Sequence, residues 1–244
     1  MASPRFYIDK PLTADTLIGL PPGPARHAQV LRMQPGYALT LFNGQGGEWQ
    51  AEVVHMGRNE VQVKVLQHDP VEREIGTSVT WALGMPTNER MDNLVEKATE
   101  LGVTRLQPLV CERSVLRLQD ERAQKKVAHW QAVAVAACEQ CGRNRVPEIA
   151  PVLTLASWLG SLPEPGPRTS RHLLSLRAGI PPWRAPAPGA SMVFLSGPEG
   201  GLAPSEEGWA QQQGFNPVSL GPRTLRADTA PVMVLAVLAA GSGA

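Results

Sequence analysis

The sequence holds few cysteines and no long apolar run, and both shortages limit what the chain can be. Its 3 cysteines are an odd number, which argues against a framework of disulfide bonds. The longest apolar run, Ala230 to Ala240, is too short to span a bilayer and contains Pro231. No basic segment followed by an apolar core stands near the N-terminus, so we expect no signal peptide. These features predict a soluble, cytosolic protein.

The chain also has no large excess of charge of either sign. Lysine and arginine together number 23, aspartate and glutamate 22, and the formal net charge is +1. A nucleic-acid partner would therefore be held by a local basic patch rather than by bulk attraction. Most of the basic residues are arginine, which suits bidentate contacts with phosphate. Codon bias is the simpler reason for that excess, because alanine, proline and glycine are also abundant.

Residues 1–72 carry a pattern that is typical of β-structure. Apolar and polar residues alternate in short runs between Ala38 and Gln67. Asn43-Gly44 and Gly57-Arg58-Asn59 separate these runs and are typical of hairpin turns. Several short strands at close spacing predict a small β-barrel, an architecture that suits an RNA-binding or adaptor module.

Over residues 73–244 the pattern changes to strands that alternate with helices. Apolar residues from Met91 to Leu101 recur on one face of a helix that ends at Gly102. A long helix is predicted from Asp120 to Gly142. This alternation predicts a mostly parallel sheet, which binds ligands at the C-terminal ends of its strands.

Three predicted strand ends are candidates for such a ligand site. They are Leu173–Gly179, Leu195–Gly201 and Ser219–Pro231. Glycines in the second and third segments permit positive φ angles and close approach of a ligand to the backbone. The third segment runs into a helix that Asp228 and Thr229 can cap, so free N–H groups are expected there. Each turn alone is ordinary, and neither the Walker nor the Rossmann phosphate motif is present.

The order of these segments resembles a known family. "GPEGG" (197–201) followed by "LGPRTLRADTA" (220–230) is similar to the SPOUT methyltransferases, and more closely to their RsmE type. Further matching pieces are "RFYI" near the start, "HAQVLRM" from His27, "EKATELGV" (96–103), "ERSV" (112–115) and "ACEQCGRNRVPEI" (137–149). One position departs from the family pattern, because Asp228 stands where a glutamate is usual.

The resemblance implies a function and a fold. It implies methylation of N3 of a uridine in the decoding region of 16S ribosomal RNA, the small-subunit RNA, with S-adenosyl-L-methionine as cofactor. It further implies a PUA-like β-barrel over residues 1–72, a trefoil-knotted α/β domain over residues 73–244, and a homodimer with the cofactor at the subunit interface. No membrane and no metal are implied.

The resemblance and the strand ends together predict the site residues. Backbone groups of three segments would hold the cofactor, with adenine beside Leu220 and Leu225. The predicted cofactor residues are Leu174, Ser175, Leu176, Gly197, Pro198, Glu199, Gly200, Gly201, Ser219, Leu220, Gly221, Leu225, Thr229 and Ala230. The predicted catalytic residues are Arg226, Arg223, Glu199 and Asp228. The predicted RNA-binding residues are Arg5, His27, Arg32 and Arg143.

Plainer roles compete with several of these assignments. Cys138 and Cys141 form a C-x-x-C pair late in a helix, where packing is a better explanation than redox or zinc chemistry. Arg143 can pair with Glu139 one helical turn away instead of facing the RNA. Glu199 can brace its loop by accepting backbone N–H bonds rather than act as a base. His27 and the nearby arginines Arg5, Arg26 and Arg32 can be a solvated surface.

Two other functions remain as alternatives. One is a SPOUT enzyme that methylates another base or a ribose hydroxyl. The other is a ribosome-binding assembly factor that has lost catalysis, which failure to bind the cofactor would favour. The complete glycine segments and "LRADTA" favour an active enzyme.

Overall fold

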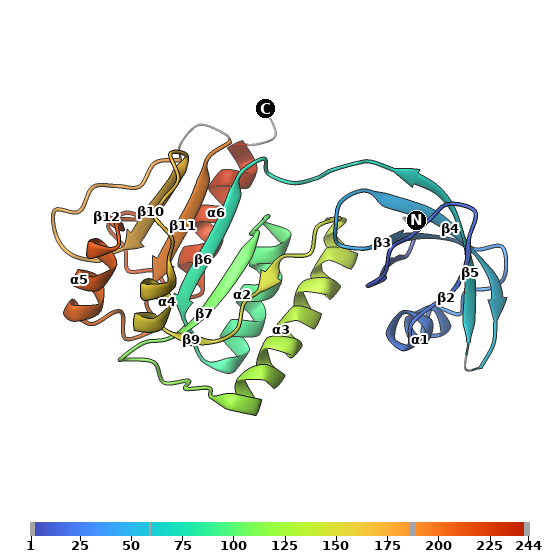
Figure 1. Cartoon of the computed structure of the whole chain (residues 1–244), viewed down its shortest axis with the longest axis horizontal. Coiled ribbons are helices and arrows are strands. Elements are labelled where there is room, and N and C mark those ends of the chain that lie inside the picture. Colours follow the sequence, from blue (N-terminus) through green and yellow to red (C-terminus); the bar gives the residue numbers. More distant parts are fainter. Residues whose placement is uncertain (1–2, 59, 186–188, 242–244) are drawn as a thin grey trace. The chain divides into compact units, whose positions relative to one another are not determined.

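The structure is a computed structural model that describes residues 3–58, 60–185 and 189–241. These residues form two compact units. The first unit comprises the chain up to Glu74 together with Val135–Val146, and the second comprises the remainder. Both units can be followed in Figure 1, in which colour runs along the sequence.

The first unit is built on a five-stranded sheet with the order β1-β3-β4-β5-β2. Strand β1 pairs with β3 in parallel, and the other pairings are antiparallel. Its elements are β1 (Arg5–Tyr7), β2 (Leu17–Gly19), α1 (Pro22–Val30), β3 (Ala38–Phe42), β4 (Glu48–Met56) and β5 (Val61–Asp69).

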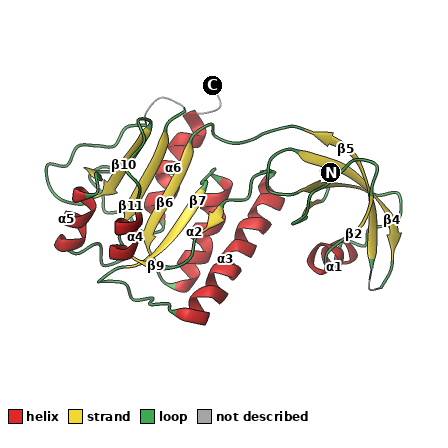
Figure 2. Cartoon of the chain, viewed as in Figure 1, coloured by secondary structure: helices red, strands yellow, loops and turns green. Residues whose placement is uncertain are grey.

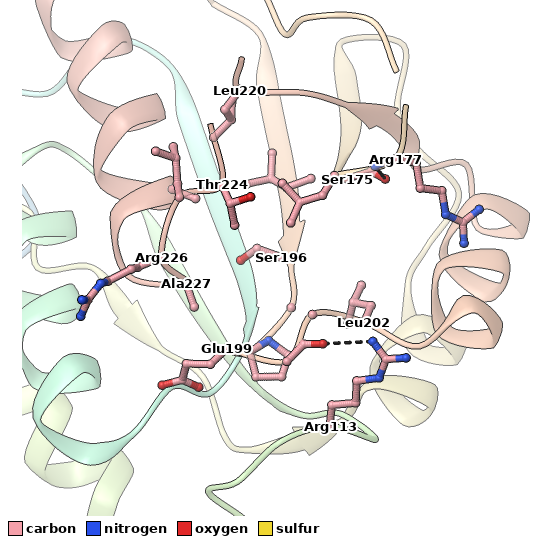
Figure 3. Close-up of a pocket in the computed structure, with 18 of the residues that line it drawn as sticks. Arg113, Ser175, Arg177, Ser196, Glu199, Leu202, Leu220, Thr224, Arg226 and Ala227 are labelled. Atoms are coloured by element: carbon pink, nitrogen blue, oxygen red, sulfur yellow. Dashed lines mark hydrogen bonds between the residues drawn. The ribbon is translucent and has the colours of Figure 1, made fainter. Parts of the chain in front are cut away.

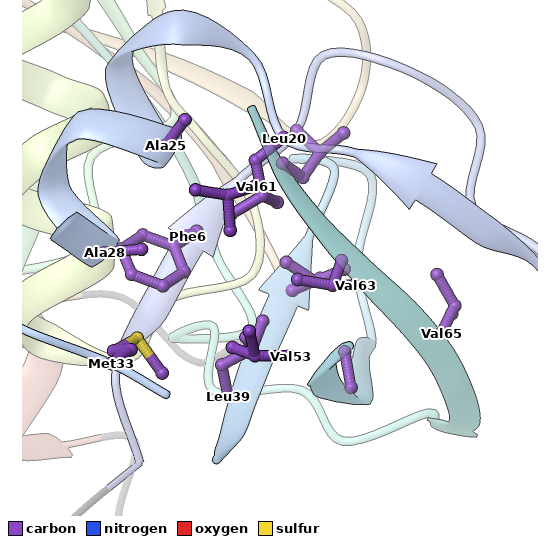
Figure 4. Close-up of a cluster of buried hydrophobic side chains, with 13 residues drawn as sticks. Phe6, Leu20, Ala25, Ala28, Met33, Leu39, Val53, Val61, Val63 and Val65 are labelled. Atoms are coloured by element: carbon purple, nitrogen blue, oxygen red, sulfur yellow. The ribbon is translucent and has the colours of Figure 1, made fainter. Parts of the chain in front are cut away.

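Strict alternation places one face of this sheet in a core. Val61, Val63 and Val65 of β5 are fully buried, whereas Lys64 between them is exposed, because successive side chains of a strand point to opposite faces. Ala25 and Ala28 of α1 pack into the same cluster, as Figure 4 shows. The sequence periodicity thus defines the core of this unit.

The second unit is a parallel sheet covered by helices (Figure 2). The strand order is β12-β10-β11-β6-β7-β8, and β9 also pairs with β7. The strands are β6 (Ser78–Gly84), β7 (Arg105–Val110), β8 (Glu148–Ile149), β9 (Leu153–Thr154), β10 (Thr169–Leu174), β11 (Ser191–Ser196) and β12 (Asn216–Val218). The helices are α2 (Asn88–Glu100), α3 (Asp120–Cys141), α4 (Leu155–Ser161), α5 (Pro204–Gln212) and α6 (Thr229–Gly241), and α3 contributes its part from Val135 to the first unit.

All the pairings in this sheet are parallel, so the strands end at one edge. The centre of the sheet is aromatic: Trp81 of β6 stacks on Phe194 of β11 with ring centroids 4.6 Å apart, and both are fully buried. The Trp81 Nε1–H donates to the Ser196 hydroxyl at 3.0 Å, which fixes that hydroxyl at the end of β11. Burying such large rings stabilises the strands that carry the site.

Most of the predicted elements are present, and a few short ones were not predicted. Helix α4 and the two-residue strands β8 and β9 follow the long helix without a clear periodic signal. The first unit ends at Glu74 rather than at residue 72, and it also includes Val135–Val146, which the sequence pattern did not indicate. None of the helices among the described residues combines the length and hydropathy needed to span a bilayer.

Candidate functional site at the ends of three strands

A cavity of about 690 Å³ opens at the edge where the parallel strands end. The segments after β10, β11 and β12 all contribute to its wall, because parallel strands deliver their C-terminal ends to the same edge. Of the residues predicted to hold a cofactor, all but Ser219 and Thr229 line it. The fold therefore brings together three segments that lie far apart in the sequence.

The segment after β11, residues 197–201, is here called the glycine loop, and glycine shapes it at two positions. A Cβ on Gly197 would lie 2.6 Å from the carbonyl carbon of Gly201, so the loop can close only without one. Gly201 has a φ of +69°, in the left-handed region that most side chains disfavour. These two residues fold the loop back on itself and turn its backbone toward the cavity.

Glu199 braces this loop. Its Oε1 accepts a hydrogen bond from the Thr87 N–H at 3.1 Å and lies 3.4 Å from Nη1 of Arg90. Thr87 precedes α2, so the carboxylate joins the end of the β6 segment to the glycine loop. Glu199 therefore makes the backbone contact expected of a residue that braces its loop, which is the alternative to a general-base role.

A second carboxylate, Glu206, fixes the same loop from below the surface. It is only 4% exposed. One oxygen accepts from the Ala203 N–H at 2.9 Å and the other from the Glu112 N–H at 2.8 Å. Next to Glu112, the Arg113 guanidinium donates to the Gly200 carbonyl at 3.0 Å. The segment "ERSV", matched to the family without a role, therefore holds the glycine loop in place.

The cavity is apolar and hydroxyl-bearing inside, whereas its charged groups extend outward. Figure 3 shows Ser196 and Thr224 between the leucines, with the guanidinium groups of Arg177 and Arg226 directed away from them on opposite sides. Arg226 and Arg223 are exposed, and neither side chain has an ion pair among the residues that the structure describes. Arg226 is thus available to a molecule that approaches from solvent.

Asp228 does not take the orienting role predicted for it. No ion pair joins it to Arg223 or Arg226 within the described part of the chain, and its Oδ1 is buried without a hydrogen-bond partner. Helix α6 begins at the next residue, and the N–H groups of Thr229 and Ala230 donate to the Arg226 carbonyl instead. The preceding turn is held by the Ser219 hydroxyl, which accepts from the Gly221 N–H at 3.2 Å.

Two of the predicted RNA-binding arginines are structural residues of the first unit. The Arg143 side chain is 5% exposed and makes two hydrogen bonds to Glu74, at 3.0 and 2.6 Å. Arg5 lies 2.5 Å from Glu48 and donates to Asn144 Oδ1 at 2.7 Å. The prediction that Arg143 faces the RNA is therefore wrong, because burial and a bidentate pair occupy its guanidinium.

His27 and Arg32 differ from this pair, since both are exposed. The His27 ring contacts Phe6 edge-on, with centroids 5.3 Å apart, which leaves its remaining surface to solvent. Arg32 follows α1 with a φ of +52°, so the chain turns sharply there. These two residues remain candidates for an RNA contact on the first unit.

Two of the three cysteines, Cys111 and Cys138, are buried packing residues. Burial raises the pKa of the Cys111 and Cys138 thiols to about 12, far from the range in which a thiolate forms. The Cys138 Sγ–H donates to the Arg145 carbonyl at 3.6 Å. No group of metal-ligating side chains occurs within the described ranges.

Several residues of the cavity wall were missed by sequence reasoning. Arg90, Arg113 and Arg177 follow β6, β7 and β10, and Ser196 ends β11. The strand-end rule that found the glycine segments applied equally to β6 and β7 and would have indicated Arg90 and Arg113. Glu206 lies outside the cavity wall, and its bond to the Glu112 N–H was not indicated because that partner is 94 residues away in the chain.

Comparison with known proteins now defines the class. A family model described as "RNA methyltransferase domain" matches residues 73–239, and one described as "RNA methyltransferase PUA domain" matches residues 25–66. The chain belongs to this family of RNA methyltransferases.

Its relatives are more specific. Ribosomal RNA small subunit methyltransferase E of Synechocystis is 34% identical over 85% of this chain and 67% of its own length. The protein of the same name from Bacillus subtilis is 31% identical over 86% of this chain and 84% of its own length. Among solved structures, ribosomal RNA small subunit methyltransferase E of Neisseria gonorrhoeae bound to S-adenosyl methionine matches with a TM-score of 0.89 and 33% identity over 97% of both chains. A methyltransferase of Legionella pneumophila in complex with SAM matches with a TM-score of 0.91 and 33% identity over 99% of this chain and 98% of that one.

Proposed function

We propose that this protein transfers a methyl group from S-adenosyl-L-methionine to N3 of a uridine in the decoding region of 16S ribosomal RNA. The observation that carries the proposal is the cavity at the ends of β10, β11 and β12. It lies in a chain that matches a SAM-bound ribosomal RNA methyltransferase over 97% of its length. The enzyme would act in the cytoplasm, where ribosomes are assembled.

The cavity suits this cofactor in size and lining. Its volume of about 690 Å³ falls within the range of small-molecule sites. Leu220 and Leu225 offer apolar contacts for adenine, and the backbone of Gly197–Gly201 lies open to polar groups. The Ser196 hydroxyl, held by Trp81, supplies a fixed polar group at the floor.

The step that requires catalysis is activation of the nucleophile, N3 of uridine. Bound S-adenosyl-L-methionine supplies an activated methyl group on a sulfonium leaving group. N3 of uridine carries a proton, and its lone pair becomes available only when that proton leaves. The resulting negative charge spreads over O2 and O4, so a fixed cation beside these oxygens lowers the barrier.

Arg226 is the first candidate for that cation. It lines the cavity and is exposed, and its planar guanidinium can reach two acceptors at once. Arg223 is the second candidate, on the same loop. Glu199 is a positioning residue in this scheme, since Thr87 and Arg90 already engage its carboxylate. Asp228 directly precedes α6 and takes no catalytic part in this scheme.

The first unit would recruit the RNA. The match of residues 25–66 to an RNA methyltransferase PUA domain supports this role. His27 and Arg32 are its proposed contacts, because their side chains are exposed while those of Arg5 and Arg143 are committed to carboxylates. Arg26, exposed beside His27, extends the same surface.

The proposal includes a homodimer and a trefoil knot. Helix α6 is apolar on nearly every face, and Met233 and Val237, one turn apart, remain 40% and 45% exposed. A second subunit would cover them. The knot is supported by the path of the chain, which leaves the edge strand β12 and returns to pack α6 against α2. Light scattering tests the dimer, and a monomer mass at micromolar concentration would contradict it.

The decisive experiment is chemical mapping of the RNA. Small-subunit RNA from a strain that lacks the protein should lack one 3-methyluridine, and the purified protein with S-adenosyl-L-methionine should restore it in small subunits or in free RNA. Methylation at a ribose or another base would favour the alternative SPOUT activity. Binding to the subunit without any binding of the cofactor would favour a non-catalytic assembly factor.

A further inference from the structure

The cavity concentrates positive charge in a chain that is otherwise nearly neutral. Its wall includes five arginines (Arg90, Arg113, Arg177, Arg223 and Arg226) against two glutamates (Glu199 and Glu207), an excess of three positive charges. The whole chain carries only +1. The rest of the chain therefore carries a net negative charge, and the excess of positive charge is located at the cavity opening.

The proposed cofactor does not account for that excess. S-adenosyl-L-methionine carries a sulfonium and an ammonium cation but only one carboxylate, so it is itself a cation. An excess of arginine at its cavity opposes its binding unless an anion arrives as well. The charge therefore suits a second, polyanionic ligand.

Three of these arginines, Arg90, Arg113 and Arg177, are held in place by the cavity wall and are here called the rim arginines. Nη1 of Arg90 lies 3.4 Å from Glu199, Nη1 of Arg113 donates to the Gly200 carbonyl, and Nη2 of Arg177 lies 2.7 Å from Glu207. Each described contact engages one nitrogen of a group with five N–H donors. Arg113 and Arg177 are exposed and the Arg90 side chain is 35% exposed, so their remaining N–H groups can reach a phosphate, and the wall limits the entropy lost on binding.

We propose that the rim arginines of the second unit bind the phosphate backbone of the RNA substrate beside the base that enters the cavity. This inference rests on the proposed function, because that function supplies RNA as the polyanion. Figure 3 shows Arg113 and Arg177 on one side and Arg226 on the other, with Ser196 and Thr224 between them. A strand that crosses this opening meets Arg113 and Arg177 on one side of the target base and Arg226, the proposed catalytic cation, on the other.

A consequence is positive coupling between RNA and cofactor. Phosphates that neutralise the rim remove the repulsion felt by the sulfonium, so RNA should tighten binding of S-adenosyl-L-methionine. The product S-adenosylhomocysteine has a neutral sulfur and should respond less. By linkage, the cofactor should tighten binding of RNA by the same factor.

The test compares Arg177→Gln with Arg122→Gln in the full-length protein. Arg177 is exposed and does not bond the glycine loop, whereas Arg122 is an exposed arginine of α3 outside the cavity. Affinity for transcribed small-subunit RNA is measured over a range of salt concentrations. Each lost phosphate contact lowers the slope of log affinity against log salt by about 0.7 in single-stranded RNA, and the affinity should fall by about tenfold.

We expect the slope to decrease by about 0.7 in Arg177→Gln and to keep its wild-type value in Arg122→Gln. Arg177→Lys should recover most of the decrease. Calorimetry should find S-adenosyl-L-methionine affinity in Arg177→Gln equal to wild type or tighter. An unchanged slope in both Arg177→Gln and Arg113→Gln overturns the proposal, as does a large loss of cofactor affinity with RNA binding intact. A wild-type protein that binds RNA through the rim without methylating it would instead overturn the proposed function alone.

Discussion

Four arginines of the first unit differ from the arginines around the cavity of the second unit in how they are paired. In the first unit Arg5 and Arg73 face Glu48, Arg143 faces Glu74, and Arg145 faces Glu72, all within 3.0 Å. Around the cavity, Arg223 and Arg226 have no such partner among the described residues, and the rim arginines keep open edges. The number of arginines in a region therefore says little about nucleic-acid binding, whereas their pairing indicates which can accept a phosphate.

The largest expected effect concerns the glycine loop, on which the cavity depends. Gly197→Ala should weaken binding of S-adenosyl-L-methionine by about 100-fold or more, because the new Cβ would lie 2.6 Å from Gly201 and force the loop open. Calorimetry measures the affinity. Gly208→Ala in α5 is the matched control, since its Cβ meets nothing within 4 Å. Equal affinity in the two variants would remove the glycine loop from the cofactor site.

The next effect tests whether catalysis needs the planar guanidinium of Arg226 or only its positive charge. Arg226→Lys keeps the charge but loses the fork, so turnover on small-subunit RNA should fall by about 100-fold. Cofactor affinity should stay within about threefold of wild type, because Arg226 is exposed and its side chain makes no bond to the cavity wall among the described residues. Single-turnover rates with saturating cofactor provide the measurement. Normal turnover would move the catalytic role to Arg223.

A paired arginine should behave in the opposite way. Arg143→Met leaves Glu74 without its buried partner and should lower the free energy of unfolding by about 3 kcal/mol. Cofactor affinity should not change, because Arg143 belongs to the first unit. Denaturant unfolding measures the loss, with Arg226→Met as the comparison that should leave stability within about 0.5 kcal/mol. Wild-type stability in Arg143→Met would contradict the claim that the paired arginines stabilise the fold and the cavity arginines do not.

The smallest effect is a pH dependence confined to the first unit. Burial alone would raise the pKa of Glu48, but hydrogen bonds from Arg73 and Arg5 outweigh burial and lower that pKa to about 2. The stabilisation from Glu48 is therefore complete above its ordinary pKa of 4.5 and is lost as the pH falls toward 2. Unfolding curves of wild type and Glu48→Gln should converge over this range. Parallel curves would show that the pair adds no pH-dependent stability.

The sequence predicted the elements whose periodicity is complete and the site segments that follow strands. The alternation of Val61, Val63 and Val65 indicated the core of the first unit, and the glycines after β11 indicated the cavity. Arg143 was misassigned because its partner, Glu74, is 69 residues away and only the fold brings the two together. Local pattern carries the period of a helix or strand, but it carries no information on which distant carboxylate an arginine meets.

The first unit is discontinuous, since it includes Val135–Val146, and this affects how the protein is made. The strands that end before Glu74 leave the ribosome about 70 residues ahead of Asn144, a partner of Arg5. At about 5–20 residues per second, that interval lasts about 4–14 s. During this interval the nascent sheet lacks Val135–Val146, the segment that completes its ion-pair network. A fragment that ends at this point would therefore encode only part of the unit.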